Sequence, residues 1–154
     1  HGHGPFPTED ESLRSIVSER HNVDNPWQRA FRVGWFDLPL ADYAIRACGR
    51  VVNEIALTHC DKLAARSHWR VATSYPFELD MIHPADFERR QRFTQCLMEM
   101  GTRMGSPTYT DIDTGSVPDY IAQHLGLPVT IKSWGPRSGQ KEFSEVNAPC
   151  SASC

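Results

Sequence analysis

Two short segments place polar side chains directly after apolar runs, where they could hold a flat, nitrogen-rich ring. The first is Thr58-His59-Cys60-Asp61, which follows the apolar residues 55–57. The carboxylate of Asp61 could accept two hydrogen bonds from adjacent N–H donors on the edge of a purine such as guanine, and the His59 ring could cover a base. An aspartate after a strand is also common in ordinary turns, so this segment alone does not establish a site.

The second segment is Ser133-Trp134-Gly135-Pro136, which follows another apolar run. Gly135 allows close backbone approach to a flat ligand, and Pro136 fixes the turn that would present it. By itself the segment is also typical of an ordinary turn.

Arginines provide a third candidate, in the stretch 26–37 ahead of a predicted helix. Arg29 and Arg32 carry guanidinium groups, which bind carboxylates and phosphates through two parallel hydrogen bonds. Two solvated arginines in a surface loop are the alternative. His1 and His3 lack a third ligand at metal-site spacing, so we expect a turn-rich loop there and no metal site.

Helices and strands that would position these residues can be predicted from spacing. Residues 1–34 are rich in Gly, Pro, Asn and Asp, which predicts a loop-rich segment with one short helix near 13–17. Asp37 then precedes a helix, with Pro39 in its first turn and Gly49 just past its end. The run Ile55 to Thr58 fits a buried strand of the parallel type, whose carboxyl end is where ligands bind in open α/β sheets.

The remaining pattern predicts two more strands and two more helices. A Phe and Met stripe is expected to belong to the core, and His124 is expected to be a packing residue. The expected ranges are strands at 69–75 and 129–134, and helices at 85–104 and 116–126. The fold class is therefore α/β, with a partial mixed sheet and flanking helices.

Composition limits the possible functions. A chain of 154 residues, 40% hydrophobic, is long enough for one domain. The net charge of -3 gives no basic field for nucleic acid or an anionic membrane, and no apolar run is long enough to span a bilayer or resembles a signal peptide. Five scattered cysteines favour reduced thiols, so we expect a cytoplasmic protein.

Taken in order, four segments resemble the adenylosuccinate synthetase family. They are Gly4-Pro5-Phe6-Pro7-Thr8-Glu9, Gly34-Trp35-Phe36-Asp37, residues 57–61 and residues 128–136. The resemblance extends to about Phe143 and implies the carboxy-terminal portion of a P-loop-related fold. We therefore expect 1–154 to be a single partial domain. It would comprise a loop-rich substrate-side segment (1–34), a base-binding α/β part (35–143) and a flexible tail (144–154).

This resemblance implies a GTP-dependent, magnesium-requiring ligase and homodimer that joins IMP to L-aspartate through 6-phosphoryl-IMP in AMP synthesis. By the same resemblance, Asp61 and His59 would contact the base, while Ser133, Gly135 and Pro136 would form the pocket wall. Arg29 and Arg32 would bind aspartate and the IMP side. His1 and Gly2 would lie by the IMP ribose.

Two departures from the family pattern leave the substrates open. His59 stands where the family has lysine, so another purine triphosphate could replace GTP. The stretch from Asn22 to Arg29 is closer to the archaeal and phage-type branch. An alternative is therefore a phage-type enzyme that acts on dGMP and forms 2-aminoadenylosuccinate.

The family's Gly-rich phosphate loop does not occur in this sequence, which begins at His1 rather than Met. We therefore expect a fragment that lacks its amino-terminal half, contains no catalytic residue or magnesium ligand, and does not catalyse the reaction alone. Two other classes stay open: a noncatalytic purine-nucleotide-binding module, and a structural α/β domain that binds nothing.

Overall fold

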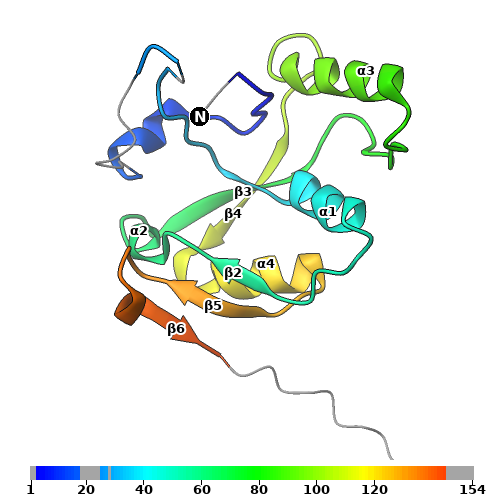
Figure 1. Cartoon of the computed structure of the whole chain (residues 1–154). Helices are drawn as coiled ribbons and strands as arrows, with labels where there is room; N and C mark the ends of the chain where they lie inside the picture. Colours follow the sequence, from blue (N-terminus) through cyan, green and yellow to red (C-terminus); the bar gives the residue numbers. More distant parts are fainter. Residues whose placement is uncertain (1–2, 18–24, 28, 145–154) are drawn as a thin grey trace, which may run out of the picture.

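A computed structural model describes residues 3–17, 25–27 and 29–144 of the chain. Helices and strands alternate along most of it (Figure 1). In chain order they are 3-10 helix η1 (Glu11–Ser15), β1 (Phe36–Asp37), α1 (Leu38–Ala47), β2 (Ile55–Leu57), α2 (Cys60–Leu63), β3 (His68–Ser74), α3 (Phe87–Met98), β4 (Thr108–Asp113), 3-10 helix η2 (Thr114–Ser116), α4 (Val117–Leu125), β5 (Val129–Ser133), 3-10 helix η3 (Ser138–Gln140) and β6 (Lys141–Phe143).

The strands form two small mixed sheets. In the first, the order is β1-β3-β4, with β1 parallel to β3 and β3 antiparallel to β4. In the second, the order is β2-β5-β6, with β2 parallel to β5 and β5 antiparallel to β6. The predicted mixed α/β fold is therefore confirmed.

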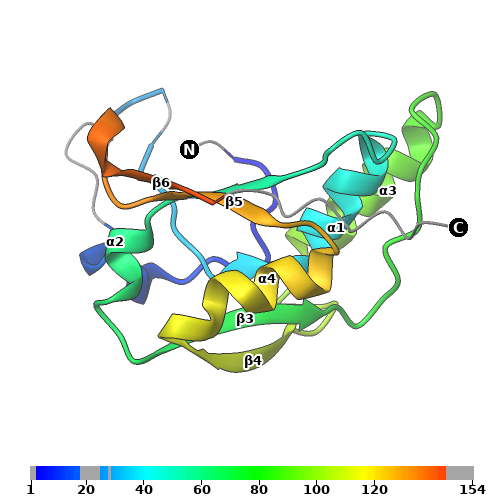
Figure 2. The same cartoon turned by 90° about the horizontal axis from the view of Figure 1, so that it is seen from below.

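Helices α1 and α4 lie between the two sheets, as the view from below shows (Figure 2). The main core is made where they meet β3 and β4. Its buried members are Leu38, Val71, Ile112, Val117 and Ile121. Because Ile55 and Leu57 of β2 pack on this cluster from the other sheet, the core holds both sheets against the same helices.

A second, smaller cluster anchors the amino-terminal loops. Leu13, Val33 and Trp35 are buried together, and Trp69 of β3 packs against both clusters. Gly34 allows this close packing, because a Cβ atom at that position would lie 2.5 Å from the carbonyl oxygen of Thr8. In the described part of residues 1–34, the expected short helix near 13–17 is found as the 3-10 helix η1, at Glu11–Ser15.

Capping residues mark the helices where the sequence predicted them. The Asp37 carboxylate accepts a hydrogen bond from the Leu40 amide at the start of α1, and Gly126 adopts a left-handed conformation at the end of α4. Nδ1 of the exposed His124 donates to the Tyr120 carbonyl at 2.8 Å, and its ring lies against that tyrosine, which agrees with a packing role.

Three expectations about the elements were wrong. Strands β4 and β6 were not predicted. Helix α3 ends at Met98 rather than near 104, because the chain turns at Gly101, whose φ is 78°. Phe87, expected in the core, is 67% exposed. No helix in the described ranges has the length and apolar character that crossing a membrane requires.

Candidate functional site

The ends of β2 and β5 bring the two predicted base-binding segments together. The strands are parallel, with Leu57 opposite Lys132. Their carboxyl ends therefore lie side by side, and the segments that follow them begin with Thr58 and Trp134 at the same edge. This is the edge at which open α/β sheets bind ligands.

Cys60 fixes the start of α2 at this edge. It is fully buried, and its thiol donates to the carbonyl of Leu57 at 3.4 Å. Burial raises the pKa of the Cys60 thiol, while a hydrogen bond with the backbone of Ser133 opposes that shift. The contact with Ser133 shows that α2 begins directly against the end of β5.

His59 and Asp61 lie on either side of this buried cysteine. His59 adopts a left-handed conformation, with φ of 60°, and is exposed. The Asp61 side chain is 36% exposed, and its carboxylate lies 3.3 Å from the ammonium group of Lys62. Asp61 is thus accessible to a ligand, with Lys62 as its ion-pair partner in the described part of the chain.

Lys141 supports the turn at Ser133-Trp134-Gly135-Pro136. Its ammonium group donates to the hydroxyl of Ser133 at 2.7 Å and to the carbonyl of Gly135. The side chain of Gln140 packs over Gly135, where an added Cβ atom would lie 2.6 Å from it. Lys141 could not be predicted from the sequence, because its role depends on the antiparallel pairing of β6 with β5.

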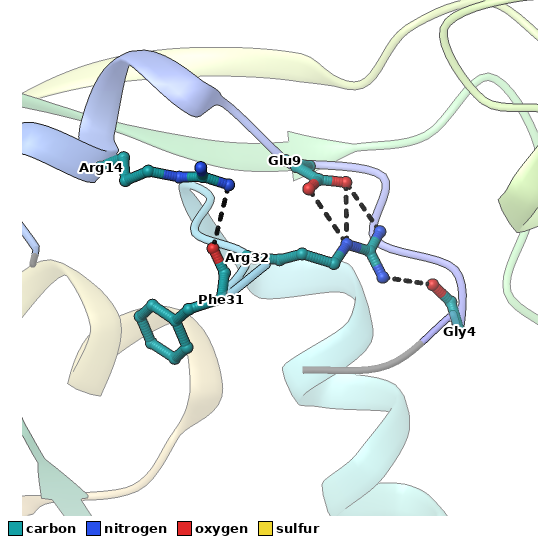
Figure 3. A network of polar contacts seen from close by, with 5 residues as sticks. All are labelled: Gly4, Glu9, Arg14, Phe31 and Arg32. Atoms are coloured by element: carbon teal, nitrogen blue, oxygen red, sulfur yellow. Dashed lines mark hydrogen bonds and ion pairs between the residues drawn. The ribbon is translucent and has the colours of Figure 1, made fainter. Parts of the chain in front are cut away.

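A separate network joins the amino-terminal loops, and Figure 3 shows its members. The guanidinium of Arg32 binds the Glu9 carboxylate through hydrogen bonds of 3.0 and 2.7 Å and donates to the Gly4 carbonyl at 2.7 Å. The hydrogen bond from Arg32 holds the pKa of Glu9 below its usual value. Arg32 thereby ties the Gly4–Glu9 segment to the segment before Gly34, beside a cavity of about 610 Å³.

The other predicted substrate residues are Arg29, His1 and Gly2. Arg29 is exposed, with φ of 57°, and its amide donates to the Asn25 carbonyl at 2.8 Å. His1 and Gly2 lie outside the described residues. The structure therefore groups His59 and Asp61 with Ser133, Gly135 and Pro136 at one sheet edge, and places Arg32 in the amino-terminal network.

Metal-binding side chains do not gather in the described ranges. No group of three or more His, Cys, Asp or Glu residues there is arranged to hold an ion.

Comparison with known proteins gives a consistent match. Residues 1–141 match the protein family described as adenylosuccinate synthetase. The adenylosuccinate synthetase of Bdellovibrio bacteriovorus is 31% identical over 88% of this chain and 33% of its own length. That of Thermoplasma volcanium is 31% identical over 87% of this chain and 34% of its own. The chain thus spans about a third of the length of these curated relatives.

A solved structure supports the fold. The fully ligated adenylosuccinate synthetase from Plasmodium falciparum superposes with a TM-score of 0.65 at 20% sequence identity. The match covers 94% of this chain and 37% of that protein.

Proposed function

The chain belongs to the adenylosuccinate synthetase family, and on that premise we propose that it supplies the purine-base pocket and part of the acceptor site of a ligase that joins IMP to L-aspartate. The observation that carries the proposal is the parallel pairing of β2 with β5. This pairing sets the accessible Asp61 carboxylate and the braced Ser133–Pro136 turn at one sheet edge. A carboxylate beside a glycine-containing turn suits a flat base with N–H donors on one edge.

Each residue of this pocket has a separate role in the proposal. Asp61 accepts the two N–H donors on the guanine edge, and His59 covers one face of the ring. Ser133, Gly135 and Pro136 form the opposite wall. Lys141 is a positioning residue, since it holds Ser133 and Gly135 in place through its two hydrogen bonds.

For the acceptor site, we propose that Arg29 and Arg32 bind the aspartate and the IMP side. The bond between Arg32 and Glu9 supports this, because it shows that the guanidinium can bind a carboxylate with two parallel bonds at this place. A substrate carboxylate would then take the position that Glu9 occupies. His1 and Gly2 would lie near the IMP ribose, outside the described residues.

The nucleotide and the metal belong to the complete enzyme in this proposal. Asp61 and the turn fit a purine base, so GTP or another purine triphosphate would be held here, and when bound it supplies the phosphoryl group that activates the acceptor. Magnesium ligands would come from the rest of the enzyme. The further proposals are a cytoplasmic homodimer, residues 1–154 as one partial domain, and an amino-terminal part that carries the phosphate loop.

Two sequence features favour a second candidate. His59 lacks the long cationic stem of the family's lysine. We also propose, from its resemblance to the archaeal and phage-type branch, that the stretch from Asn22 to Arg29 follows that pattern. The alternative is therefore a phage-type enzyme that acts on dGMP and forms 2-aminoadenylosuccinate. A noncatalytic purine-nucleotide-binding module would share the same base pocket.

Calorimetric titration of the 154-residue chain with GTP, ATP and dATP tests the base pocket. We expect binding of one purine triphosphate and a loss of about tenfold or more in Asp61→Asn, because the charged acceptor is replaced by an amide. Asp119→Asn is a matched control, since Asp119 is also an exposed aspartate in the first turn of a helix. Equal affinity in the wild type and Asp61→Asn, or no binding of any triphosphate, would refute the proposal.

A further inference from the structure

A cavity beside α2 is lined by residues of both hydrophobic clusters. Its volume is about 230 Å³. It is lined by core residues of β3 and α4, namely Val71, Val117 and Ile121, and by further residues of β2, α2 and β3. Asp61, Ser133, Gly135 and Pro136 do not line it. The cavity is therefore distinct from the site proposed for the nucleotide base, although His59 borders both.

Two tryptophans form rigid aromatic walls of this cavity. The rings of Trp35 and Trp69 meet edge to face, with 5.8 Å between their centroids. Each indole N–H is already bonded within the protein, that of Trp35 to the Asp10 carboxylate and that of Trp69 to the Leu63 carbonyl, both at 2.8 Å. The rings are thus held in place. Trp35 is 5% exposed and has the Arg66 guanidinium 5.3 Å from its ring centroid, so the partly buried Trp69 presents more of its ring to the cavity than Trp35 does.

The polar part of the cavity wall is cationic. Lys62 and Arg70 line it, and none of the described residues that line it is Asp or Glu. Lys62 is partly neutralised by Asp61. The guanidinium of Arg70 lies over the Tyr109 ring, 4.4 Å from its centroid, and forms no ion pair within 4 Å among the residues described, although its charge helps to lower the pKa of Asp10. An anionic group on a ligand would therefore find a cation at this wall.

The size of the cavity limits the ligand further. An apolar cavity of about 150 Å³ accepts benzene, whereas pockets for drug-sized molecules begin at about 300 Å³. A volume between these values suits two fused rings and is too small for a nucleoside triphosphate. We propose that this cavity binds a two-ring aromatic carboxylate, with its rings against Trp35 and Trp69 and its carboxylate on Arg70.

Titration of the intact chain with 2-naphthoate tests this assignment. We expect saturable binding, and binding at least about tenfold weaker for the neutral 2-naphthamide, because only the carboxylate can form a charge-assisted pair with Arg70. Arg70→Gln should weaken 2-naphthoate binding by a similar factor and leave the affinity for the naphthamide unchanged. Val117→Leu, which adds a methylene group to the cavity wall, should weaken the binding of both compounds.

Controls separate this site from the base pocket. Asp61→Asn should not weaken 2-naphthoate binding, because it removes a negative charge beside Lys62, whereas it should weaken nucleotide binding; the two proposals can therefore fail independently. Circular dichroism shows whether Val117→Leu folds; if it does not, Arg70→Gln decides, since Arg70 is exposed. The proposal is overturned if 2-naphthoate does not bind, if naphthamide binds equally well, or if Arg70→Gln binds 2-naphthoate like the wild type.

Discussion

His59 adopts a left-handed backbone conformation, with φ of 60° and ψ of 28°, where β2 gives way to α2. This conformation costs a residue with a Cβ atom about 1 kcal/mol or more, and glycine adopts it freely. Non-glycine residues in such conformations often occur at functional sites, where the side chain has a use that offsets the strain. Replacing His59 should therefore change the folding stability and the proposed nucleotide binding in opposite directions.

Replacing His59 with glycine should raise stability and weaken binding. We expect His59→Gly to increase the free energy of unfolding by roughly 0.5–1 kcal/mol, measured by urea denaturation. It should also weaken nucleotide binding about fivefold or more, because the ring that covers the base is lost. Arg50→Gly is the control: Arg50 is exposed with φ of 58°, so the same change there should stabilise the chain and leave binding unaltered. Unchanged nucleotide affinity in His59→Gly would exclude a role for the ring.

The sequence allowed only part of the residue-level chemistry to be predicted. Asp61 and Ser133 could be proposed because each follows an apolar run, and runs of that kind end at a sheet edge. The ion pair between Arg32 and Glu9 could not be predicted, because 23 residues separate them and two irregular loops must fold to bring them together. Lys141 was missed for a similar reason, since its contact with Ser133 exists only once β6 pairs with β5.

Among the helices, α1 and α3 begin with the same residue type in different surroundings. The carboxylate of Asp37 caps α1 through the Leu40 amide at 3.1 Å and also accepts a hydrogen bond of 2.5 Å from the half-buried Tyr75 hydroxyl. The carboxylate of Asp86 caps α3 through the Arg89 amide at 3.0 Å and is exposed. Burial raises the pKa of Asp37, against the effect of these two hydrogen bonds. Asp37 thus connects α1 to the end of β3, whereas Asp86 serves its own helix.

Removing the two caps should therefore have unequal effects. Asp86→Ala should cost about 1 kcal/mol, the usual value of an N-cap. Asp37→Ala should cost roughly 2–4 kcal/mol, because the Tyr75 hydroxyl also loses its partner away from water. Urea denaturation of both variants measures the difference. In a Tyr75→Phe background the excess cost of Asp37→Ala should largely disappear; if it persists, the hydrogen bond to Tyr75 is not its cause.

Proline and glycine residues at helix ends predicted the helices well, whereas apolar spacing alone did not predict every strand or every buried face. Pro39, Gly49 and Gly126 mark the helix ends that the structure shows. Strand β4 was missed because its six residues, Thr108–Asp113, are mostly polar and form an edge strand with one exposed face. For α3, apolar spacing predicted a buried stripe, but spacing alone does not reveal whether a covering surface exists. Phe87 is accordingly exposed.

For the whole molecule, two sheets share one layer of helices, and the proposed base pocket lies at an edge of the second sheet (Figure 2). In the proposal, this pocket holds the base, and the amino-terminal arginines position the acceptor. Phosphoryl transfer also requires fixed positive charge and metal ions around the transferring group, which supply most of the catalysis. The 154 residues contain no Gly-rich phosphate loop. Binding and turnover should therefore be separable in this chain.

We accordingly expect the chain alone to bind a purine triphosphate but to form no detectable adenylosuccinate. The measurement is chromatographic analysis of product after incubation with GTP, magnesium, IMP and L-aspartate, with dGMP replacing IMP in a parallel reaction. The full-length Bdellovibrio bacteriovorus relative, of which this chain matches 33%, is the positive control. Arg32→Ala is the negative control, because Arg32 is proposed to hold the acceptor. If the wild-type chain formed product and Arg32→Ala did not, the 154 residues would suffice for catalysis. Such a result would place the phosphate-handling groups within this chain and contradict the division of labour proposed for the enzyme.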